Sequence, residues 1–418
     1  MGNGSLAAAF LIYSLLLFQV SSTTSLQNPH LVVQDVNSRK NASSVAVAGA
    51  APALGRKLLK SSSSSSGGGC KTGNLIDDCW RCDPDWDSNR GRLADCAFGF
   101  GKEAMGGKAA ADNPYVVVDN GDDVNHPKPG TLRYGVIQPK ATWIIFATDM
   151  TIKLKDELVV IHPFKTIDGR GVDVHIAGGP CVNVHATHNF ILHGVSIHDC
   201  QVGGNERIGE AGYFQRSDGD GIQVYQSSNV WIDHCNFSKA VDGLVDVIQG
   251  STNVTISNNL FTNHNKVMLL GQSDEGHDTN MKVTVAYNVF GEGLTQRMPR
   301  CRQGYFEVVN NYYPSGWNEY AIGGSSNPTI KSQGNVFVAP SNRDHWEVTS
   351  REDVPESEYK IWNWASEGDM MVGGAFFVPS GAENTSSVYA KASGVVAQAA
   401  KAVPDITRNA GPFNPSRI

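Results

Sequence analysis

The segment NVWIDHCNF, residues 229–237, recurs along the chain as NVTISNNLF (253–261), KVTVAYNVF (282–290) and YFEVVNNYY (305–313). A fifth copy ends in GNVF (334–337). Aligning the copies gives two columns of like residues, each advancing by steps of 24, 29, 23 and 24. One column is Cys235, Asn259, Asn288, Asn311 and Asn335, and the other is Phe237, Phe261, Phe290, Tyr313 and Phe337. Steps this regular indicate a structural unit that is repeated in space.

A period of this length in short β-rich segments predicts an all-β solenoid, a parallel β-helix. From about residue 115 onward such segments alternate with Gly and Asn, and helical periodicity is absent over roughly 200 residues. Corresponding residues of adjacent coils would lie about 4.7–4.9 Å apart, which is the spacing of neighbouring strands. Stacked Asn side chains hydrogen-bond to one another and stacked rings fill a core, so both columns are predicted to be structural.

The margins of the repeat predict further features. The longest step, from Asn259 to Asn288, contains an extra segment, 272–278, which predicts a loop on one side of the β-helix. After Asn335 the repeat fades, and the aromatic stretch 341–378 is expected to pack along the solenoid or to cover its end. Apolar residues between Trp86 and Phe100 recur at helical spacing, which predicts a short N-terminal helical cap at one end of the main body.

The charge balance limits the choice of partner. The chain has 418 residues, with 34 Lys and Arg against 41 Asp and Glu, and a net charge of −7. This balance argues against nucleic acid as a partner, although a local cationic groove would still hold an acidic polymer.

The N-terminal segment 1–69 predicts export. Leu6–Val20 is an apolar run of 15 residues, shorter than the about 20 residues of a membrane span, and it matches a signal peptide over 1–22. We expect a secreted protein with no membrane attachment after cleavage, and a flexible arm over 23–69 that ends in a Ser- and Gly-rich linker. A β-helix domain over 70–385 and a tail over 386–418 would follow. Asn41 and Asn384 are the expected glycosylation sites.

Secretion makes the eight cysteines candidates for disulfides. The Cys79-x-x-Cys82 pair has zinc as its alternative, but no His or second C-x-x-C lies nearby. Cys235 occupies the Asn column, which predicts a buried free thiol, and Cys301 is also left without an obvious partner. The candidates for pairing are Cys70, Cys79, Cys82, Cys96, Cys181 and Cys200.

Charged residues share the same period. Asp218, Asp242 and Lys266 are separated by equal steps of 24 (242 − 218 and 266 − 242), which predicts that they lie on successive coils of one face. Strand alternation adds Asp220 beside Asp218 and Asp246 beside Asp242. Four carboxylates this close repel one another unless a cation neutralises them, and an open, irregular set of oxygen ligands favours calcium.

Three cations occur in the same region: Lys266, Arg297 and Arg302. A solvated acidic face is the alternative to a functional site. The mixture of acids and bases instead favours a substrate that is itself an anion and is bridged to the protein through the metal.

Longer motifs resemble those of the plant pectate lyases: WIIF (143–146), DGRG (168–171), VWIDH (230–234), DGLVD (242–246) and QRMPRCR (296–302). These enzymes belong to a polysaccharide lyase family of right-handed, single-stranded parallel β-helices that also includes pollen allergens. The resemblance covers roughly residues 70–385, and CWRCD (79–83) through LADC (93–96) is similar to the family's N-terminal cap. It implies that Cys79 pairs with Cys96 and that Cys181 pairs with Cys200.

The resemblance also implies roles for the charged residues. Asp218, Asp242 and Asp246 match the calcium-binding acids, and some relatives carry Glu at the position of Asp242. Asp220 matches an acid of the same cluster, and Lys266 and Arg302 match substrate-binding cations. Arg297 matches the residue that takes the C5 proton of the substrate. Since arginine has a solution pKa above about 12, such a base needs neighbouring cations that disfavour its charged form.

The resemblance thus implies a secreted, monomeric, calcium-dependent enzyme of the plant cell wall that cleaves α-1,4-linked polygalacturonate by β-elimination. A glycoside hydrolase with two carboxylates would leave Lys266, Arg297 and Arg302 unexplained. A pectin lyase acting on methyl esters would not need four acids. The remaining alternative is a catalytically silent wall-binding or allergen-like protein on the same scaffold. His234 is expected to pack or hydrogen-bond, and Asp233 is as consistent with a structural carboxylate as with a site residue.

Overall fold

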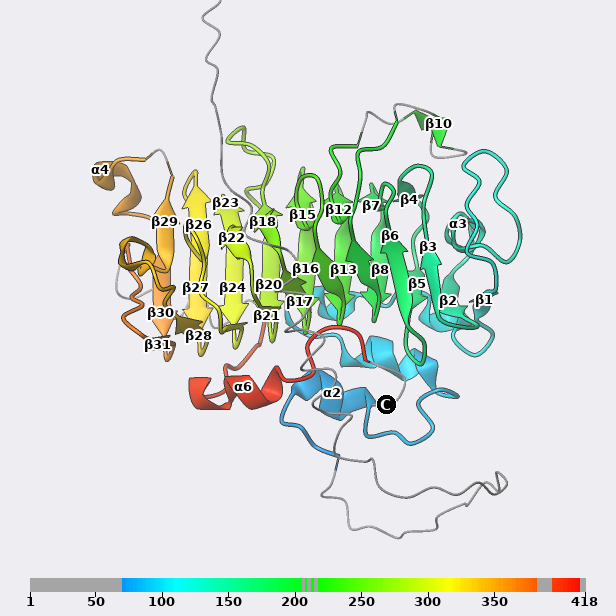
Figure 1. Cartoon of the computed structure of the whole chain (residues 1–418), viewed down its shortest axis with the longest axis horizontal. Coiled ribbons are helices and arrows are strands. Elements are labelled where there is room, and N and C mark those ends of the chain that lie inside the picture. The colour runs from blue at the N-terminus through cyan, green and yellow to red at the C-terminus, as the bar shows by residue number, and fades with distance from the viewer. Residues whose placement is uncertain are drawn as a thin grey trace, which may run out of the picture. The chain divides into compact units, whose positions relative to one another are not determined.

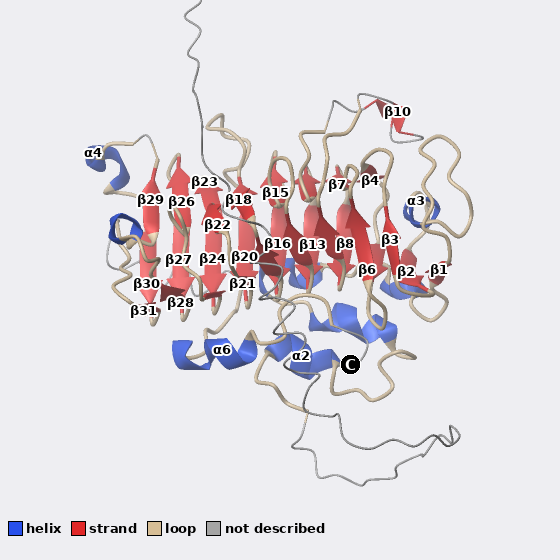
Figure 2. Cartoon of the chain, viewed as in Figure 1, coloured by secondary structure: helices blue, strands red, loops and turns tan. Residues whose placement is uncertain are grey.

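The computed structural model describes residues 70–204, 207–208, 212–213, 217–352, 354–381 and 393–413. All of them belong to one compact unit, Ser65–Ile418, separate from a first unit, Met1–Ser64. Most of the described chain is β-strand, and the helices are short (Figure 2). The predicted signal peptide, the arm and the sequons at Asn41 and Asn384 lie outside the described residues.

Three long sheets contain nearly all of the strands. In spatial order, the ten-stranded sheet consists of β1 (Tyr115–Val117), β2 (Thr142–Phe146), β5 (Lys165–Asp168), β8 (His188–His193), β13 (Ser228–Asp233), β16 (Thr252–Ser257), β20 (Lys282–Ala286), β24 (Tyr305–Val309), β27 (Thr329–Gln333) and β30 (Trp364–Glu367). The nine-stranded sheet consists of β3 (Met150–Ile152), β6 (Val174–Ala177), β9 (Ser196–His198), β14 (Asn236–Ser238), β17 (Leu260–Thr262), β21 (Val289–Phe290), β25 (Tyr312–Tyr313), β28 (Val336–Val338) and β31 (Met370–Val372). The eight-stranded sheet consists of β29 (Thr349–Arg351), β26 (Ile322–Ser325), β23 (Arg300–Arg302), β19 (Met268–Leu270), β15 (Val245–Ile248), β12 (Ile222–Tyr225), β7 (Val182–His185) and β4 (Leu158–Val160).

Two small sheets and the helices complete the described structure. The small sheets pair β18 (His264–Lys266) with β22 (Leu294–Gln296), and β10 (Arg207–Ile208) with β11 (Gly212–Tyr213). The helices are α2 (Leu75–Trp80), η2 (Arg90–Cys96), η3 (Gly99–Glu103), η4 (Lys108–Ala110), α3 (Leu132–Val136), η6 (Arg343–His345), α4 (Glu356–Tyr359), η7 (Ala400–Ala402) and α6 (Val403–Ile406).

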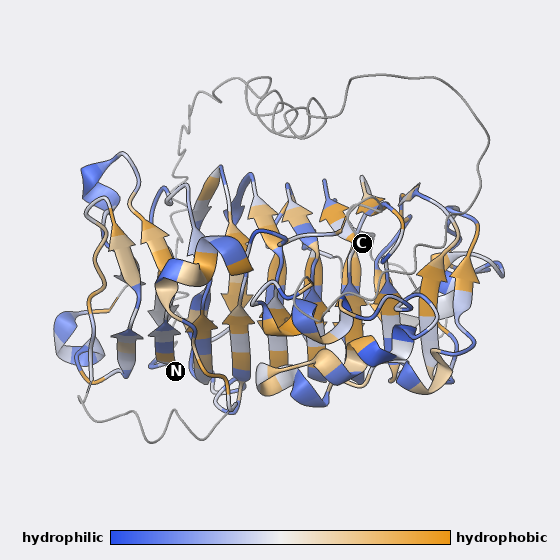
Figure 3. Cartoon of the chain, turned by 90° about the horizontal axis from the view of Figure 1, so that it is seen from below, coloured by the Kyte–Doolittle hydropathy of each residue, from blue (hydrophilic) through white to orange (hydrophobic). Residues whose placement is uncertain are grey.

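Successive strands enter the three long sheets in turn, so that one coil contributes one strand to each (Figure 1). β13, β14 and β15 form such a coil, and each pairs in parallel with the corresponding strand of the next, β16, β17 and β19. The architecture is therefore the predicted parallel β-helix. Its interior is a single apolar cluster that runs through all of the coils, and Figure 3 shows hydrophobic residues recurring along the strands.

The two predicted columns are both present. Asn288 Nδ2 donates to Asn311 Oδ1 at 2.9 Å and to the Ile256 carbonyl at 2.9 Å, and its Oδ1 accepts from the Asn259 backbone N–H at 2.9 Å. Each Asn side chain thus satisfies backbone groups of the preceding coil and contacts the Asn of the next one. The ring centroids of the aromatic column lie 5.5, 5.1, 4.6 and 4.5 Å apart from Phe237 to Phe337. These columns hold the coils in register.

Cys235 begins the Asn column with its backbone N–H, which donates to Asn259 Oδ1 at 2.8 Å. Its thiol is buried and free, as predicted, and burial raises its pKa to about 12. Cys301 is also buried and free. At the other end Asn335 donates its backbone N–H to Asp369 Oδ1 at 2.7 Å, so a carboxylate that the sequence did not reveal ends the column.

The stretch 341–378 is more regular than the sequence suggested. It contributes β29, β30 and β31, one to each long sheet, and so forms one more coil. The sequence hid this coil because Phe337 is paired with Met371, after a step longer than any other in the aromatic column (371 − 337). Trp362 and Trp364 are buried in the core there, which agrees with the expectation that these aromatics cover the end. At the other end, Leu132 and Val136 of α3 are buried in the same core.

The N-terminal helices form, but they cover a side of the β-helix rather than its end. Gly101 N–H donates to Thr255 Oγ1 at 2.8 Å and Gly107 N–H to Thr166 Oγ1 at 2.9 Å, which places η3 and η4 against the ten-stranded sheet. The reason is the outward apolar surface of that sheet, where Trp143 and Trp231 are fully buried under the cap. Threonines on the sheet accept from glycine N–H groups, so the two surfaces approach closely.

The C-terminal segment 393–413 packs on this cap. Asn74 Nδ2 donates to the Ile406 carbonyl at 2.9 Å, and the Phe413 ring lies 5.6 Å from the ring of Trp80. α2 and α6 accordingly lie side by side (Figure 1).

Disulfides close the cap and one coil. The bonds are Cys70–Cys82, Cys79–Cys96 and Cys181–Cys200. The last two are those that the resemblance implied, and the first resolves the partners of Cys70 and Cys82. Among the described residues, no helix has the length and apolarity needed to cross a membrane.

Candidate metal and substrate site

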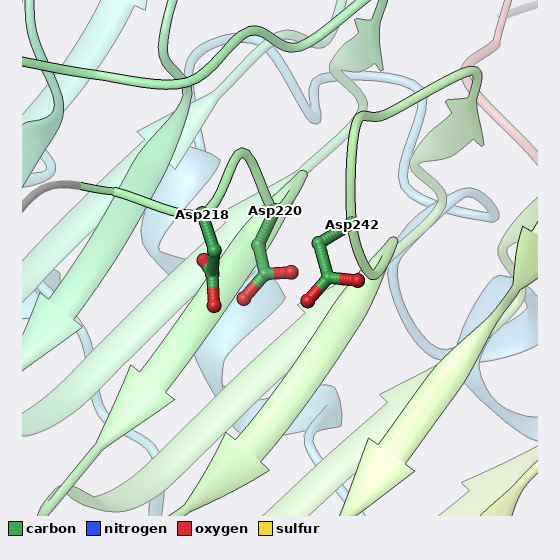
Figure 4. Close-up of side chains that lie close together, drawn as sticks. All are labelled: Asp218, Asp220 and Asp242. Carbon is green, nitrogen blue, oxygen red and sulfur yellow. The ribbon is translucent and has the colours of Figure 1, made fainter. Parts of the chain in front are cut away.

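The acids gather where two neighbouring coils enter the eight-stranded sheet. Asp218 and Asp220 precede β12, and Asp242 precedes β15, which pairs with β12 in the register Ile222↔Val245. One carboxylate oxygen from each of the three residues lies within 4.8 Å of the others. Figure 4 shows the three carboxyl groups side by side and facing the same space. The step from Asp218 to Asp242 is therefore one coil, as predicted.

Asp246 is buried and is not one of the three acids whose oxygens lie within 4.8 Å of one another. It is on β15 opposite Gln223 of β12. Gly243 separates it from the others: a Cβ atom at Gly243 would lie 2.3 Å from Asp246 Oδ1 and 3.0 Å from Asp220 Oδ1. The Gly243 N–H also donates to Asp220 Oδ1 at 2.6 Å. Because Gly243 has no side chain, Asp246 and Asp220 can both lie close to its backbone.

Burial and mutual repulsion raise the pKa values of three of these acids. Burial raises the pKa of Asp220 well above its usual value, and the charges of Asp246 and Asp218 raise it further. The pKa of Asp246 is raised to about 7 by burial and by Asp242 and Asp218, against the lowering effect of Arg297. Burial and the charge of Asp242 raise the pKa of Asp218. The acids therefore carry more negative charge than the surrounding described residues neutralise.

A divalent cation that prefers oxygen ligands would neutralise this excess negative charge. Among the described residues, Asp246 Oδ1 is buried and accepts no hydrogen bond, a costly state unless another partner is present. The donor set is made of carboxylate oxygens alone, which suits calcium or magnesium rather than a metal that prefers nitrogen or sulfur. Calcium tolerates an irregular set of carboxylates better than magnesium, which demands a near-ideal octahedron. The residues present therefore fit calcium.

Lys266 extends the column of acids as predicted. It ends β18, on the coil after Asp242, and its Nζ donates to Asp242 Oδ1 at 2.5 Å. Its side chain remains 41% exposed, so the ammonium group is accessible from solvent.

The position of Arg297 explains its irregular spacing. β18 pairs with β22 in the register Lys266↔Gln296, so Arg297 follows one coil beyond Lys266. The step (297 − 266) is longer than 24 because the loop around 272–278 lengthens this coil, and Asp278 ties the loop down by accepting from Gly250 and Gln272 N–H groups. The Nε of Arg297 is buried and donates no hydrogen bond to the described residues.

Arg302 lies at the end of β23, in the same sheet as Asp246. Its Nη1 donates to the Gly271 carbonyl at 3.0 Å, and its Nε lies 3.5 Å from Asp274 Oδ1. Burial lowers its pKa, and the charges of Arg300 and Arg297 lower it further. Of the three predicted cations, Lys266 therefore contacts Asp242, Arg297 interacts electrostatically with Asp246, and Arg302 interacts electrostatically with Arg297.

The sequence missed two residues of this site. Gly243 is one, and His264 is the other: its Nε2 lies 2.5 Å from the Asp242 carbonyl oxygen. The signal for His264 was its place two residues before Lys266, on the same side of one strand.

Asp233 and His234 lie elsewhere, under the cap. Asp233 Oδ1 accepts from Ser257 Oγ at 2.6 Å, and His234 Nε2 lies 2.8 Å from Asp77 Oδ1. Both are fully buried. Their contacts are structural, as expected for His234.

The fold and the site together define a class of protein. A parallel β-helix that carries clustered carboxylates, with cations on the coils that follow, is suited to an acidic, extended polymer.

Comparisons with known proteins identify the family. A family model described as pectate lyase matches residues 94–411. The chain is 53% identical over 410 residues to "Probable pectate lyase 5" of Arabidopsis thaliana, covering 96% of this chain and 95% of that protein. It is 52% identical over 398 residues to "Pectate lyase" of Zinnia elegans, covering 94% of each. The crystal structure of jun a 1, the major allergen from cedar pollen, matches with a TM-score of 0.78 and 47% identity, over 82% of this chain and 100% of that one.

The chain belongs to the pectate lyase family and is an enzyme of that family. The structural match also confirms the right-handed parallel β-helix that the sequence resemblance implied.

Proposed function

We propose that the chain is a secreted, calcium-dependent lyase of the plant cell wall that cleaves α-1,4-linked polygalacturonate by β-elimination. The observation that carries this proposal is the set of three carboxylates within 4.8 Å of one another, bordered directly by Lys266. Such a site suits a polyanion, because the metal ion and Lys266 would offset the repulsion between the carboxylates of the substrate and those of the protein. Family membership supports the reaction, since plant relatives that match over nearly their full length are named as pectate lyases.

Asp218, Asp220, Asp242 and Asp246 would hold the calcium ion in this proposal. When bound, calcium supplies positive charge shared between these acids and a uronate carboxylate, which acidifies the neighbouring C5–H. The raised pKa values of Asp218, Asp220 and Asp246 support a requirement for a cation.

The cations would act on the substrate. Lys266 and Arg302 bind uronate carboxylates, since both guanidinium and ammonium groups form charge-assisted hydrogen bonds to them. Arg297 takes the proton from C5, a C4=C5 double bond forms, and the bond between C4 and the glycosidic oxygen breaks. The freed oxygen takes a proton from water and becomes the hydroxyl of a new reducing end.

The test is an ultraviolet absorbance assay for unsaturated uronate on polygalacturonate, with and without a calcium chelator. We expect absorbance to rise with calcium, to stop with chelator and to return when calcium is restored. Activity that survives chelation, or new reducing ends without unsaturation, would overturn the proposal.

The catalytically silent alternative has one supporting observation, the 47% identity to a pollen allergen. The same assay separates the two functions, because a wall-binding protein would bind polygalacturonate without producing unsaturated ends. Secretion is tested separately by expressing the full chain in plant cells and sequencing the N-terminus of the protein from the wall fraction. Gel filtration of that protein tests the expected monomer.

A further inference from the structure

The loop that joins β19 to β20, which includes residues 272–278, contacts Arg302 at two points. The Gly271 carbonyl oxygen accepts from Arg302 Nη1 at 3.0 Å, and Asp274 Oδ1 lies 3.5 Å from Arg302 Nε. A Cβ atom at Gly271 would lie 2.7 Å from the Arg302 carbonyl oxygen, so the first residue of the loop is packed directly against β23. The loop therefore presents one oxygen atom to each of two sides of the guanidinium group.

Further contacts hold Asp274 beside the guanidinium group. Its Oδ1 accepts from the hydroxyl of Ser326, the residue after β26, and its carbonyl oxygen accepts from Gln303 Nε2 at 3.1 Å. The far end of the loop is fixed by Asp278, which accepts from two backbone N–H groups at 2.7 and 3.0 Å. The side chain of Asp274 is 71% exposed, whereas that of Arg302 is 17% exposed. Since an ion pair with an exposed partner contributes little to stability, Asp274 can exchange Arg302 for water at small cost.

These contacts restrict how Arg302 can bind another carboxylate. A guanidinium group binds a carboxylate most strongly through two parallel N–H groups on one edge. One such edge of Arg302 is formed by Nε and Nη2, and the other by Nη1 and Nη2. The first has its Nε beside Asp274, and the second is engaged by the Gly271 carbonyl. A substrate carboxylate that binds through either edge must displace one of these oxygen atoms. Because Gly271 is packed against β23, the exposed carboxylate of Asp274 is the one that gives way.

We propose that Asp274 competes with a substrate carboxylate for Arg302 and thereby limits the affinity of the enzyme for acidic units of the polymer. This inference rests on the proposed function, in which Arg302 binds a uronate carboxylate. Asp274 also repels that carboxylate, because two anions approach the same guanidinium group. A methyl-esterified unit carries no charge there, so it neither pairs with Arg302 nor is repelled. Asp274 therefore reduces the preference for a free acid over a methyl ester at this position.

The test compares Asp274→Asn with Glu275→Gln in the full chain. Both substitutions remove one negative charge from the same loop, but Glu275 is 82% exposed and its carboxylate lies 3.8 Å from His277 Nε2. Calorimetry with calcium present measures the binding of trigalacturonate, in an Arg297→Lys background that prevents turnover. Asp274→Asn should lower the Kd about two- to fivefold, the range expected for an exposed ion pair. Glu275→Gln should leave the Kd nearly unchanged.

Steady-state kinetics with native Arg297 provide the second measurement. Asp274→Asn should lower the KM for polygalacturonate and leave kcat unchanged, because the contact with Arg302 is made equally in the ground state and the transition state. The KM for highly methyl-esterified pectin should not change.

Equal Kd values in Asp274→Asn and Glu275→Gln would overturn the inference. Weaker binding in Asp274→Asn would also overturn it, because Asp274 would then orient Arg302 for the substrate. The calorimetric difference needs binding alone, so a protein that binds trigalacturonate without cleaving polygalacturonate would contradict the proposed lyase activity and leave the competition at Arg302 standing.

Discussion

The arrangement of the acid cluster depends on a glycine, Gly243. A Cβ atom at Gly243 would lie 2.3 Å from Asp246 Oδ1, so only a bare backbone fits between that carboxylate and Asp220. The same residue donates its N–H to Asp220 Oδ1, which fixes the direction of this carboxylate. The absence of a Cβ atom at Gly243 therefore decides whether Asp246 and Asp220 can both contribute to the proposed cation site.

Gly243→Ala should weaken calcium binding at least tenfold, because the new methyl group must displace Asp246 or Asp220. Isothermal titration of the chelator-treated protein with calcium measures this. Gly121→Ala is the control, since its Cβ would lie 3.1 Å from the carboxylate of Asp119, away from the cluster. Unchanged affinity in Gly243→Ala would show that the cation does not lie against these two acids.

Arg297→Lys should lower kcat on polygalacturonate by about 10²–10⁴-fold, the usual contribution of a general base. Lysine keeps the positive charge but is shorter and has one nitrogen, so it cannot reproduce the position of the guanidinium group. Calcium affinity and the thermal unfolding midpoint should stay close to wild type, which separates loss of the base from loss of the site. A variant that retains a tenth of the activity would rule Arg297 out as the base.

The strands of the β-helix could be predicted from the sequence wherever successive coils repeat the same residues. The Asn and aromatic columns were visible in the sequence because each coil from β13 to β28 has the same register and similar corners. The coil of β29, β30 and β31 was hidden because Met371 replaces the aromatic and Asp369 replaces the Asn, after a longer step. Local sequence reveals a coil only when it preserves both spacing and residue type.

Asn288→Ala should lower the free energy of unfolding by about 3–5 kcal/mol. It would leave the Asn259 backbone N–H and the Ile256 carbonyl buried without partners, at about 1–3 kcal/mol each, and would remove the contact with Asn311. Chemical denaturation measures the loss. Asn280→Ala, at an exposed position outside the column, should change stability by less than about 0.5 kcal/mol. Equal losses in the two variants would mean that the column does not stabilise the coils.

At the scale of the whole molecule, the described chain ends meet on the outer surface of the ten-stranded sheet. The cap contributes Trp80 and the C-terminal segment contributes Phe413 to one apolar cluster with Trp143 and Trp231. The sequence predicted a cap and a tail but not their contact, because nothing local to Phe413 specifies a partner near the other end of the described chain. In the candidate site, by contrast, the 24-residue period of the sequence predicted the positions of Asp218, Asp242 and Lys266. The position of Arg297 could be derived only from the pairing of β18 with β22 in the structure.

A buried ion pair joins the cap to the β-helix and should make stability depend on pH. Burial disfavours both charges, but the His234 imidazolium and Arg81 lower the pKa of Asp77 below 3.8, and Asp233 and Asp77 raise the pKa of His234 above 6.5. The stability from Asp77 is present above about pH 3.8 and is lost as pH falls through its folded pKa. The stability from His234 is present below about pH 6.5 and is lost as pH rises through its folded pKa. Both contributions are therefore complete between about pH 4 and 6.5.

Asp77→Asn should accordingly cost about 1.5–3 kcal/mol at pH 5.5, the value of a hydrogen bond to a charged group, and the loss should shrink toward pH 9 as the pH rises through the folded pKa of His234. Denaturant unfolding of wild type and variant at both pH values gives the two differences, in which other titrating groups cancel. Asp78→Asn is the control, because Asp78 accepts from Thr72 and from the Gly73 N–H, which do not titrate, and the loss should be the same at both pH values. A loss in Asp77→Asn of no more than about 1 kcal/mol at pH 5.5, unchanged at pH 9, would mean that His234 is not charged in the folded protein. The cap would then be held to the β-helix by a neutral hydrogen bond and by the packing of Trp80 and Phe413 alone.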